Sequence, residues 1–159
     1  MTNALFTAES QAVTRLSNIL SQHLVPLFTA TPSGKPKLVG SSFLVSSGLS
    51  YYLVSAAHVF DELTVGRGLF FYIAPKVISH LSGNLRLTKT PPGEDRKSDR
   101  LDIGVLKLEA PLLPPYPKVQ KYPLPISAFM AHALPREGKQ YLLVGFPGSK
   151  NRANPATLE

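Results

Sequence analysis

A histidine and an aspartate in this chain each stand at the boundary of an apolar segment. His58 follows the run YYLVSAA, and Asp102 directly precedes the run IGVLKL. An imidazole becomes a strong general base when a carboxylate fixes its tautomer and stabilises its charged form. A carboxylate beside an apolar strand is costly to bury without a partner. The two positions therefore predict a His58–Asp102 pair.

Each residue also has a purely structural interpretation. A single histidine beside an apolar run often only completes the packing, and an aspartate at the start of a strand is often only a turn residue. Asp99 lies three residues upstream of Asp102 and is an alternative partner, ranked lower because Asp102 directly precedes the apolar strand. The small residues before His58 favour the pairing, because large side chains would block the close approach of two strand ends.

The first element that could support this pair is a helix. Residues 1–24 are predicted to form an amphipathic helix with Thr7 as its N-cap, and Pro26 ends it. Apolar residues recur at helical spacing at Val13, Leu16, Ile19, Leu20 and Leu24. We expect this helix to pack on the outside of the elements that follow.

From residue 25 the pattern changes to short alternating segments separated by glycine and proline turns. The six predicted strands are LVPLFTAT, LVGSSFLVS, YYLVSA, GLFFYIAP, NLRLTKT and LDIGVLKLE. The expected inward side chains are Val39, Phe43 and Val45 in the second strand, and Ile103, Val105 and either Leu106 or Leu108 in the last. This spacing predicts an all-β fold with a six-stranded antiparallel barrel over residues 25–109.

The rest of the chain divides into two further segments. Residues 110–127 are predicted to form an extended interdomain linker, because a proline-rich segment cannot join the interior of a sheet. Its prolines are Pro111, Pro114, Pro115, Pro117, Pro123 and Pro125. Residues 128–159 contain the apolar stretch YLLVGFPG, which is expected to be the first strand of a second, incomplete barrel.

Composition excludes several classes of protein. The 159 residues include no cysteine, so disulfides and thiolate chemistry are excluded, and the hydrophobic content of 43% is that of a globular domain. No apolar run is long enough to span a bilayer and no secretory signal is visible, so we expect a cytoplasmic protein without a membrane partner. The histidines His23, His58, His80 and His132 form no His-x-x-x-His pair, and we expect neither a metal nor another cofactor.

The formal net charge of +7 attracts nucleic acid in a general way. Arg96, Lys97 and Arg100 form the densest basic cluster, but three acidic residues share their loop. We predict a solvated mixed-charge loop there and no specific nucleic-acid partner. A small β-barrel that binds nucleic acid is retained as the weakest alternative.

Three segments resemble the trypsin-like (chymotrypsin-fold) serine peptidases. GSSFLVSSGLSYYLVSAAHVF resembles the first catalytic block of that family, LDIGVLKLE resembles its Asp-Ile-Ala-Val-Leu block, and GKQYLLVGFPGS resembles the strand that opens its second barrel. They occur in the family's order over about residues 25–150, and the absence of cysteine is similar to bacterial members. The resemblance implies the first lobe of a double barrel and a hydrolase that cleaves protein or peptide substrates. It also implies that His58 is the general base and later the general acid, and that Asp102 orients it.

The chain departs from that family at the nucleophile. The Gly-x-Ser-Gly-Gly block is absent: Ser41 and Ser42 lie in the strand before the histidine hairpin, and nothing around Ser149 resembles that turn. The oxyanion hole and the specificity pocket would be missing with it. Two barrels need about 200 residues or more, so we expect either the N-terminal piece of a longer peptidase or a natural half-domain. The first is favoured, because YLLVGFPG would otherwise be a strand without partners.

Two functions from different classes follow. The first is a serine endopeptidase of which this chain holds the His58 and Asp102 half, so that the chain alone is inactive. The alternative is a non-catalytic peptide-binding or interaction module on the same half-fold, with a possible dimer through the exposed barrel face. A reading frame that continues into a Gly-x-Ser-Gly-Gly block would favour the enzyme.

Overall fold

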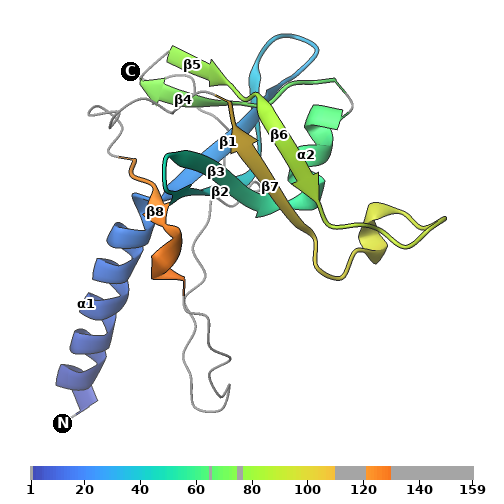
Figure 1. Cartoon of the computed structure of the whole chain (residues 1–159). Coiled ribbons are helices and arrows are strands. Elements are labelled where there is room, and N and C mark those ends of the chain that lie inside the picture. Colours follow the sequence, from blue (N-terminus) through green and yellow to red (C-terminus); the bar gives the residue numbers. More distant parts are fainter. Residues whose placement is uncertain (1, 65, 75–76, 110–120, 130–159) are drawn as a thin grey trace.

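The computed structural model describes residues 2–64, 66–74, 77–109 and 121–129. Its main body is one curled antiparallel sheet that forms a half-barrel (Figure 1). The strands follow one another across the sheet in the order β5 (Val77–His80), β4 (Phe70–Ala74), β1 (Leu24–Ala30), β2 (Pro36–Ser47), β3 (Ser50–Ala56), β7 (Ile103–Leu108) and β6 (Gly83–Leu87). The short β8 (Leu124–Pro125) pairs with β2 in parallel, off this path.

The mostly-β class and the antiparallel sheet are confirmed, but a closed six-stranded barrel is not. All six predicted strands are present, and Val77–His80 adds a seventh, β5, which pairs with β4. The path ends at β5 on one side and at β6 on the other. Within the described residues no ladder joins these two end strands, so the sheet is open.

The pairing of β3 with β7 is the feature of the sheet that matters most for the candidate site. The hairpin between β2 and β3 turns at Gly48, whose φ of 56° lies in the left-handed region that favours glycine. Strand β3 then runs antiparallel to β7, and its last residue, Ala56, lies opposite Ile103. The residue after β3 and the residue before β7 are therefore neighbours in space.

The core forms where the helix α2 (Ala57–Thr64) packs on the sheet. Val59 and Phe60 of α2 are buried among Val25, Leu27, Leu44, Leu53, Leu69, Phe71, Leu81 and Leu106. Two glycines on the strands let α2 approach closely. A Cβ on Gly104 would lie 2.5 Å from Cδ2 of Phe60, and one on Gly40 would lie 2.6 Å from Cγ2 of Val59. Both distances are too short for real atoms, so the sheet accepts the helix only because these side chains are missing.

The predicted inward positions of β7 are partly wrong. Gly104 and Leu106 are buried, whereas Ile103 is 45% exposed and Val105 is only partly buried. The alternation of β7 therefore has the opposite phase from the one expected of Ile103 and Val105. The reason is Gly104, which has no side chain and so gives no hydrophobic signal in the sequence. In the structure it faces inward, and the ring of Phe60 occupies the space where its side chain would be.

In β2 the prediction holds only in part. Val45 is buried and Val39 is partly buried against the core, as expected, but Phe43 is only partly buried. Leu44, which is not among the expected inward positions, belongs to the core. Both Leu44 and Val45 are buried, so this strand is covered on both faces and a single inward face does not describe it.

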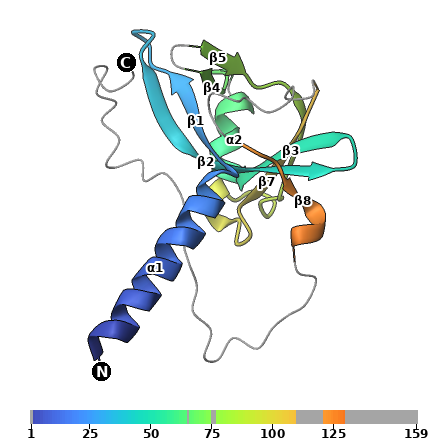
Figure 2. The same cartoon turned by 90° about the vertical axis from the view of Figure 1, so that its left-hand side faces the viewer.

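The helix α1 (Thr2–Ser21) lies within the predicted range of residues 1–24 but ends earlier and packs differently. It ends at Ser21, and both Leu24 and Pro26 belong to β1. It begins at Thr2, so Thr7 lies inside it and is not its N-cap. It projects away from the half-barrel (Figures 1 and 2). The expectation that it packs on the outside of the strands is wrong for its apolar stripe, because Val13, Leu16 and Ile19 are 50%, 50% and 54% exposed. Within the described residues, no helix is long and apolar enough to cross a membrane.

The end of α1 is joined to the segment that contains β8 and the 3-10 turn η2 (Ile126–Ala128). Lys121 Nζ donates to the carbonyl of Ser21 at 2.6 Å, and the backbone N–H of Tyr122 donates to the carbonyl of Gln22 at 2.9 Å. This part of the predicted linker lies along the sheet, with Leu124 opposite Val45. The remaining linker residues, 110–120, and residues 130–159 of the predicted second barrel lie outside the described residues.

The close approach at Gly104 gives a stability prediction. Gly104→Ala is expected to destabilise the fold by about 1–3 kcal/mol, because the new methyl group would overlap the ring of Phe60. Chemical denaturation would measure the change. In a Phe60→Leu background the same substitution should cost clearly less, because the smaller side chain removes the overlap with the ring and leaves only the contact with Cδ2 of Leu87 at 2.9 Å. An equal loss in both backgrounds would contradict the crowding explanation.

Candidate active site

The structure brings His58 and Asp102 into contact through two hydrogen bonds. His58 Nδ1 lies 2.6 Å from Asp102 Oδ2, and the backbone N–H of His58 donates to Asp102 Oδ1 at 3.0 Å. His58 is the second residue of α2, and Asp102 directly precedes β7. The pairing of β3 with β7 places these two chain positions side by side. The carboxylate can only accept, so Nδ1 carries the proton in this arrangement and Nε2 is left as the acceptor when the ring is neutral.

Asp102 also caps the start of α2. The first N–H groups of a helix have no partner inside it. Here the N–H of Ala57 donates to the carbonyl of Asp102 at 2.9 Å, and the N–H of His58 donates to its carboxylate. A negative charge at a helix N-terminus is also favoured by the helix dipole. Asp102 thus does the work of an N-cap residue, although it belongs to a distant part of the chain.

The backbone of Asp102 is unusual. Its φ of 43° is the only positive value among the non-glycine residues that the structure describes. Aspartate and asparagine tolerate this left-handed region better than most residues. The turn that it creates directs the carbonyl and the carboxylate of one residue toward the same helix end.

The pair is accessible to solvent on one side. The side chain of His58 is 60% exposed and that of Asp102 is 35% exposed, and no hydrogen bond to Nε2 is present within the described residues. Partial burial raises the pKa of the Asp102 carboxyl, but hydrogen bonds from the backbone and the ring of His58 outweigh it, so its pKa lies below the usual value. The carboxylate is therefore charged at neutral pH.

Asp99, the alternative partner, does not contact His58. It is buried, and its Oδ1 accepts from the backbone N–H groups of Leu101 and Asp102 at 3.1 and 3.0 Å. Its Oδ2 accepts from the hydroxyl of Thr88. The bond from Thr88 is the main reason that the pKa of Asp99 lies below its usual value. Asp99 therefore stabilises the turn from which Asp102 contacts the imidazole of His58.

Arg96, from the 3-10 turn η1 (Arg96–Ser98), connects that turn to α2. Its guanidinium donates to both carboxylate oxygens of Asp61 at 3.1 and 3.0 Å. Its third nitrogen, Nη1, donates to Oδ2 of Asp99 at 3.2 Å and to the carbonyl of Thr88 at 2.8 Å. Hydrogen bonding to Asp61 is the main reason that the pKa of Arg96 lies above its usual value. Since Asp61 lies one turn after His58, α2 is fixed to the same loop at two points.

This network corrects the prediction of a solvated mixed-charge loop. Lys97 and Arg100 are exposed, as that prediction requires, but Arg96 and Asp99 are partners in a partly buried network. Sequence reasoning missed Asp61, Thr88 and Arg96 altogether as contributors to the site. The signal that could have indicated this network is Asp61, an acidic residue one turn after His58 on the same short helix.

The remaining predicted candidates are not assembled with the pair. Ser42 is buried and its hydroxyl donates to the carbonyl of Val25, while the carbonyl of Ser41 accepts from Ser55. Ser149 lies outside the described residues, as does His132. Across the described part of the chain no group of three or more histidine, aspartate and glutamate side chains could hold a metal ion.

The role of Arg96 can be tested by stability. Arg96→Met should lower the melting temperature by several degrees, because Asp61 and the buried Asp99 lose a charged partner. Arg100→Met, an exposed residue of the same loop, is the matched control and should leave the melting temperature nearly unchanged. Similar losses in the two variants would show that the network is not what the arginine supports.

The lowered pKa of Asp99 predicts how stability depends on pH. A carboxylate whose folded pKa is below its unfolded value, 3.8, stabilises the fold above that value, and this contribution is lost as the pH falls through the folded pKa. Urea denaturation between about pH 2 and pH 6 should therefore show stability falling with pH in the acidic range. Asp99→Asn should show a shallower dependence, while Glu94→Gln, in an exposed position, should follow the wild type.

The comparisons with known proteins do not place this chain in a family. No protein-family model matches it, and the search of curated proteins found no match. The curled antiparallel half-barrel is compatible with a trypsin-like barrel. The resemblance to serine peptidases therefore depends on the short segments around His58 and Asp102 and on this general architecture.

Proposed function

We propose that this chain supplies the general-base half of a serine-type endopeptidase. The observation that supports this most directly is the double contact between His58 and Asp102, in which one carboxylate binds both the ring and the backbone of the histidine. This contact fixes the ring orientation and the tautomer together. A ring held in this way, with its second nitrogen exposed, has what a general base for a hydroxyl nucleophile needs.

In the proposed reaction, His58 Nε2 takes the proton from a serine hydroxyl as its oxygen attacks the carbonyl carbon of a peptide bond. Asp102 stabilises the imidazolium that forms and does not itself take the proton. The proton then passes from Nε2 to the leaving amine as the carbon–nitrogen bond breaks, which leaves an acyl-enzyme. Water repeats the same sequence on the acyl-enzyme and frees the serine.

No serine of the described strands is hydrogen-bonded to His58, so the proposal takes the nucleophile from another segment. In this proposal the half-barrel is the first lobe of a trypsin-like double barrel, and the nucleophile belongs to a second lobe with a Gly-x-Ser-Gly-Gly turn. The exposure of Leu101 and Ile103, 69% and 45%, supports a covering surface beside Asp102. The substrates would be proteins or peptides.

The test is serine-directed labelling of the native protein, recovered from its source with an antibody against this chain. A fluorophosphonate probe should label a product substantially heavier than 17.3 kDa. In the same full-length protein, His58→Ala should slow labelling by a factor on the order of 10³ or more, because the serine loses its base. His80→Ala, an exposed histidine on β5, is the matched control and should leave the rate unchanged.

Two results would contradict the proposal. One is labelling that does not depend on His58, because the imidazole would then have no role at the nucleophile. The other is a native product of 17.3 kDa that the probe does not label, which would leave a peptide-binding module as the better explanation. This chain expressed alone is expected to remain unlabelled in either case.

A further inference from the structure

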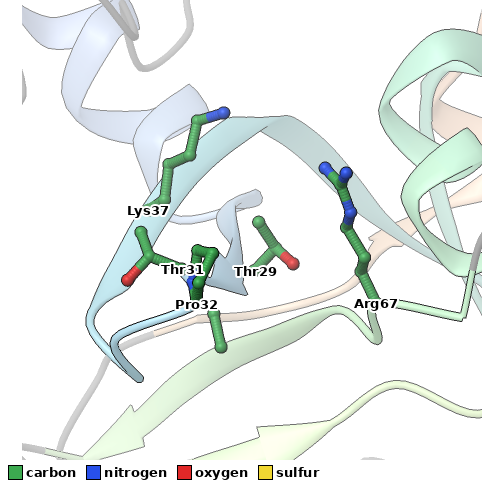
Figure 3. A pocket seen from close by; sticks show the side chains of 6 residues that line it. Thr29, Thr31, Pro32, Lys37 and Arg67 are labelled. Atoms are coloured by element: carbon green, nitrogen blue, oxygen red, sulfur yellow. The ribbon is translucent and has the colours of Figure 1, made fainter.

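A second site lies at the other end of α2 from His58. A cavity of about 450 Å³ opens between the end of the β1–β2 hairpin and the loop after α2 (Figure 3). It is lined by Thr29, Ala30, Thr31, Pro32, Lys37 and Arg67. Lys37 and Arg67 extend from opposite sides, and Thr29 lies between them. The volume is in the range of sites for small organic ligands and is larger than a bare ion needs.

The hairpin wall of this pocket is fixed by its own hydrogen bonds. Thr29 lies opposite Lys37 in the β1–β2 ladder, so both project on one face of the hairpin. Thr31 closes the turn: its N–H donates to the carbonyl of Lys35 at 2.8 Å, and its hydroxyl oxygen accepts from the N–H of Lys35 at 3.0 Å. Lys37 therefore projects from a rigid support, not from a loose loop.

The opposite wall is fixed by the end of α2. The N–H of Gly66 donates to the carbonyl of Leu63, and the N–H of Arg67 donates to the carbonyl of Glu62. With Gly66 at a φ of 75°, this pair of bonds is a Schellman motif, which fixes the backbone of Arg67. The hydroxyl of the buried Thr29 then donates to the carbonyl of Gly68 and ties the two walls together.

The charges of the pocket are poorly neutralised. None of the lining side chains is acidic. Lys37 has no ion pair among the described residues. Arg67 is 64% exposed and contacts only one oxygen of Glu62, at 3.4 Å, which is long for a charge-assisted hydrogen bond. One cation without an ion pair in the described part of the chain and one with a long ion pair, both on preformed walls, favour an anion between them.

We propose that this pocket binds the oxyanion group, a carboxylate or a phosphate, of a small ligand or a peptide side chain. Arg67 would present its guanidinium to two oxygens of the group, and Lys37 would act as a point charge from the other side. The methyl and ring carbons of Ala30, Thr31 and Pro32 would contact the rest of the ligand. This inference is independent of the proposed peptidase, because none of its residues belongs to the His58 network.

The experiment uses the whole chain and three fluorescein-labelled peptides with capped ends. They share the sequence Ser-Gly-X-Gly-Ser, with glutamate, phosphoserine or glutamine at X, and binding is read by fluorescence anisotropy. The glutamate or the phosphoserine peptide should bind at least about fivefold more tightly than the glutamine peptide. Preference for one of the two anions identifies a carboxylate or a phosphate as the group recognised.

Matched variants separate this pocket from general attraction to a basic protein. Lys37→Met and Arg67→Met should each remove most of the preference over glutamine. Lys107→Met and Arg86→Met, which replace exposed cations on β7 and β6, should retain it. Glu62→Gln should tighten binding about two- to threefold, because a competing carboxylate is removed while the backbone cap of α2 is kept.

The proposal is overturned if the glutamine peptide binds as well as the two anionic peptides. It is also overturned if Lys107→Met and Arg86→Met weaken binding as much as the pocket variants do, because the attraction would then belong to the net charge. Melting temperatures equal to that of the wild type would show that all five variants are folded. Fluorophosphonate labelling of the native protein is unaffected by either result, so failure here and failure of the peptidase proposal are distinguishable.

Discussion

The buried carboxylate of Asp99 is the constraint on which the candidate active site depends. A carboxylate removed from water has to be fully hydrogen-bonded or neutralised. The donors that satisfy Asp99 come from Thr88, Arg96 and the two backbone N–H groups that lead into β7. Because the last of these belongs to Asp102, satisfying the buried charge also fixes the left-handed turn at Asp102. No buried side-chain polar atom in the described residues lacks a partner, so the network is complete.

The second constraint is that α2 is short and has to be held from outside. A helix of eight residues has little stability of its own. Asp102 satisfies its first N–H groups, Arg96 binds Asp61 on its next turn, and Phe60 enters the space left by Gly104. Each of these contacts comes from the segment between β6 and the middle of β7. The position of the imidazole is therefore determined by a segment far from it in the sequence, and the close packing at Gly104 sets how deeply the helix sits.

How far the sequence predicts this arrangement depends on the range of the interaction. The strands and the His58–Asp102 pair follow from local signals, since apolar alternation and a polar residue at a strand boundary are visible in a short window. The role of Asp99, the contact between Arg96 and Asp61, and the inward position of Gly104 are set by tertiary packing, and a window of the sequence carries no sign of them. The open sheet and the projecting α1 were missed for a related reason: amphipathic spacing shows which face is apolar and not what covers it.

The two ends of α2 have opposite electrostatic character, and this follows from how each end is capped. At the first turn the unpaired N–H groups are met by a carboxylate, so an acidic group stands beside His58. At the last turn the unpaired carbonyls are met by the backbone of Gly66 and Arg67, which places a cation next to the pocket with Lys37. These arrangements agree with the helix dipole, which favours negative charge at the start and positive charge at the end. One short helix, about 12 Å long, thus separates the proposed general-base site from the proposed anion site. The two sites share no side chain, so a pocket side chain can be substituted without removing a hydrogen-bonding group of the His58 network.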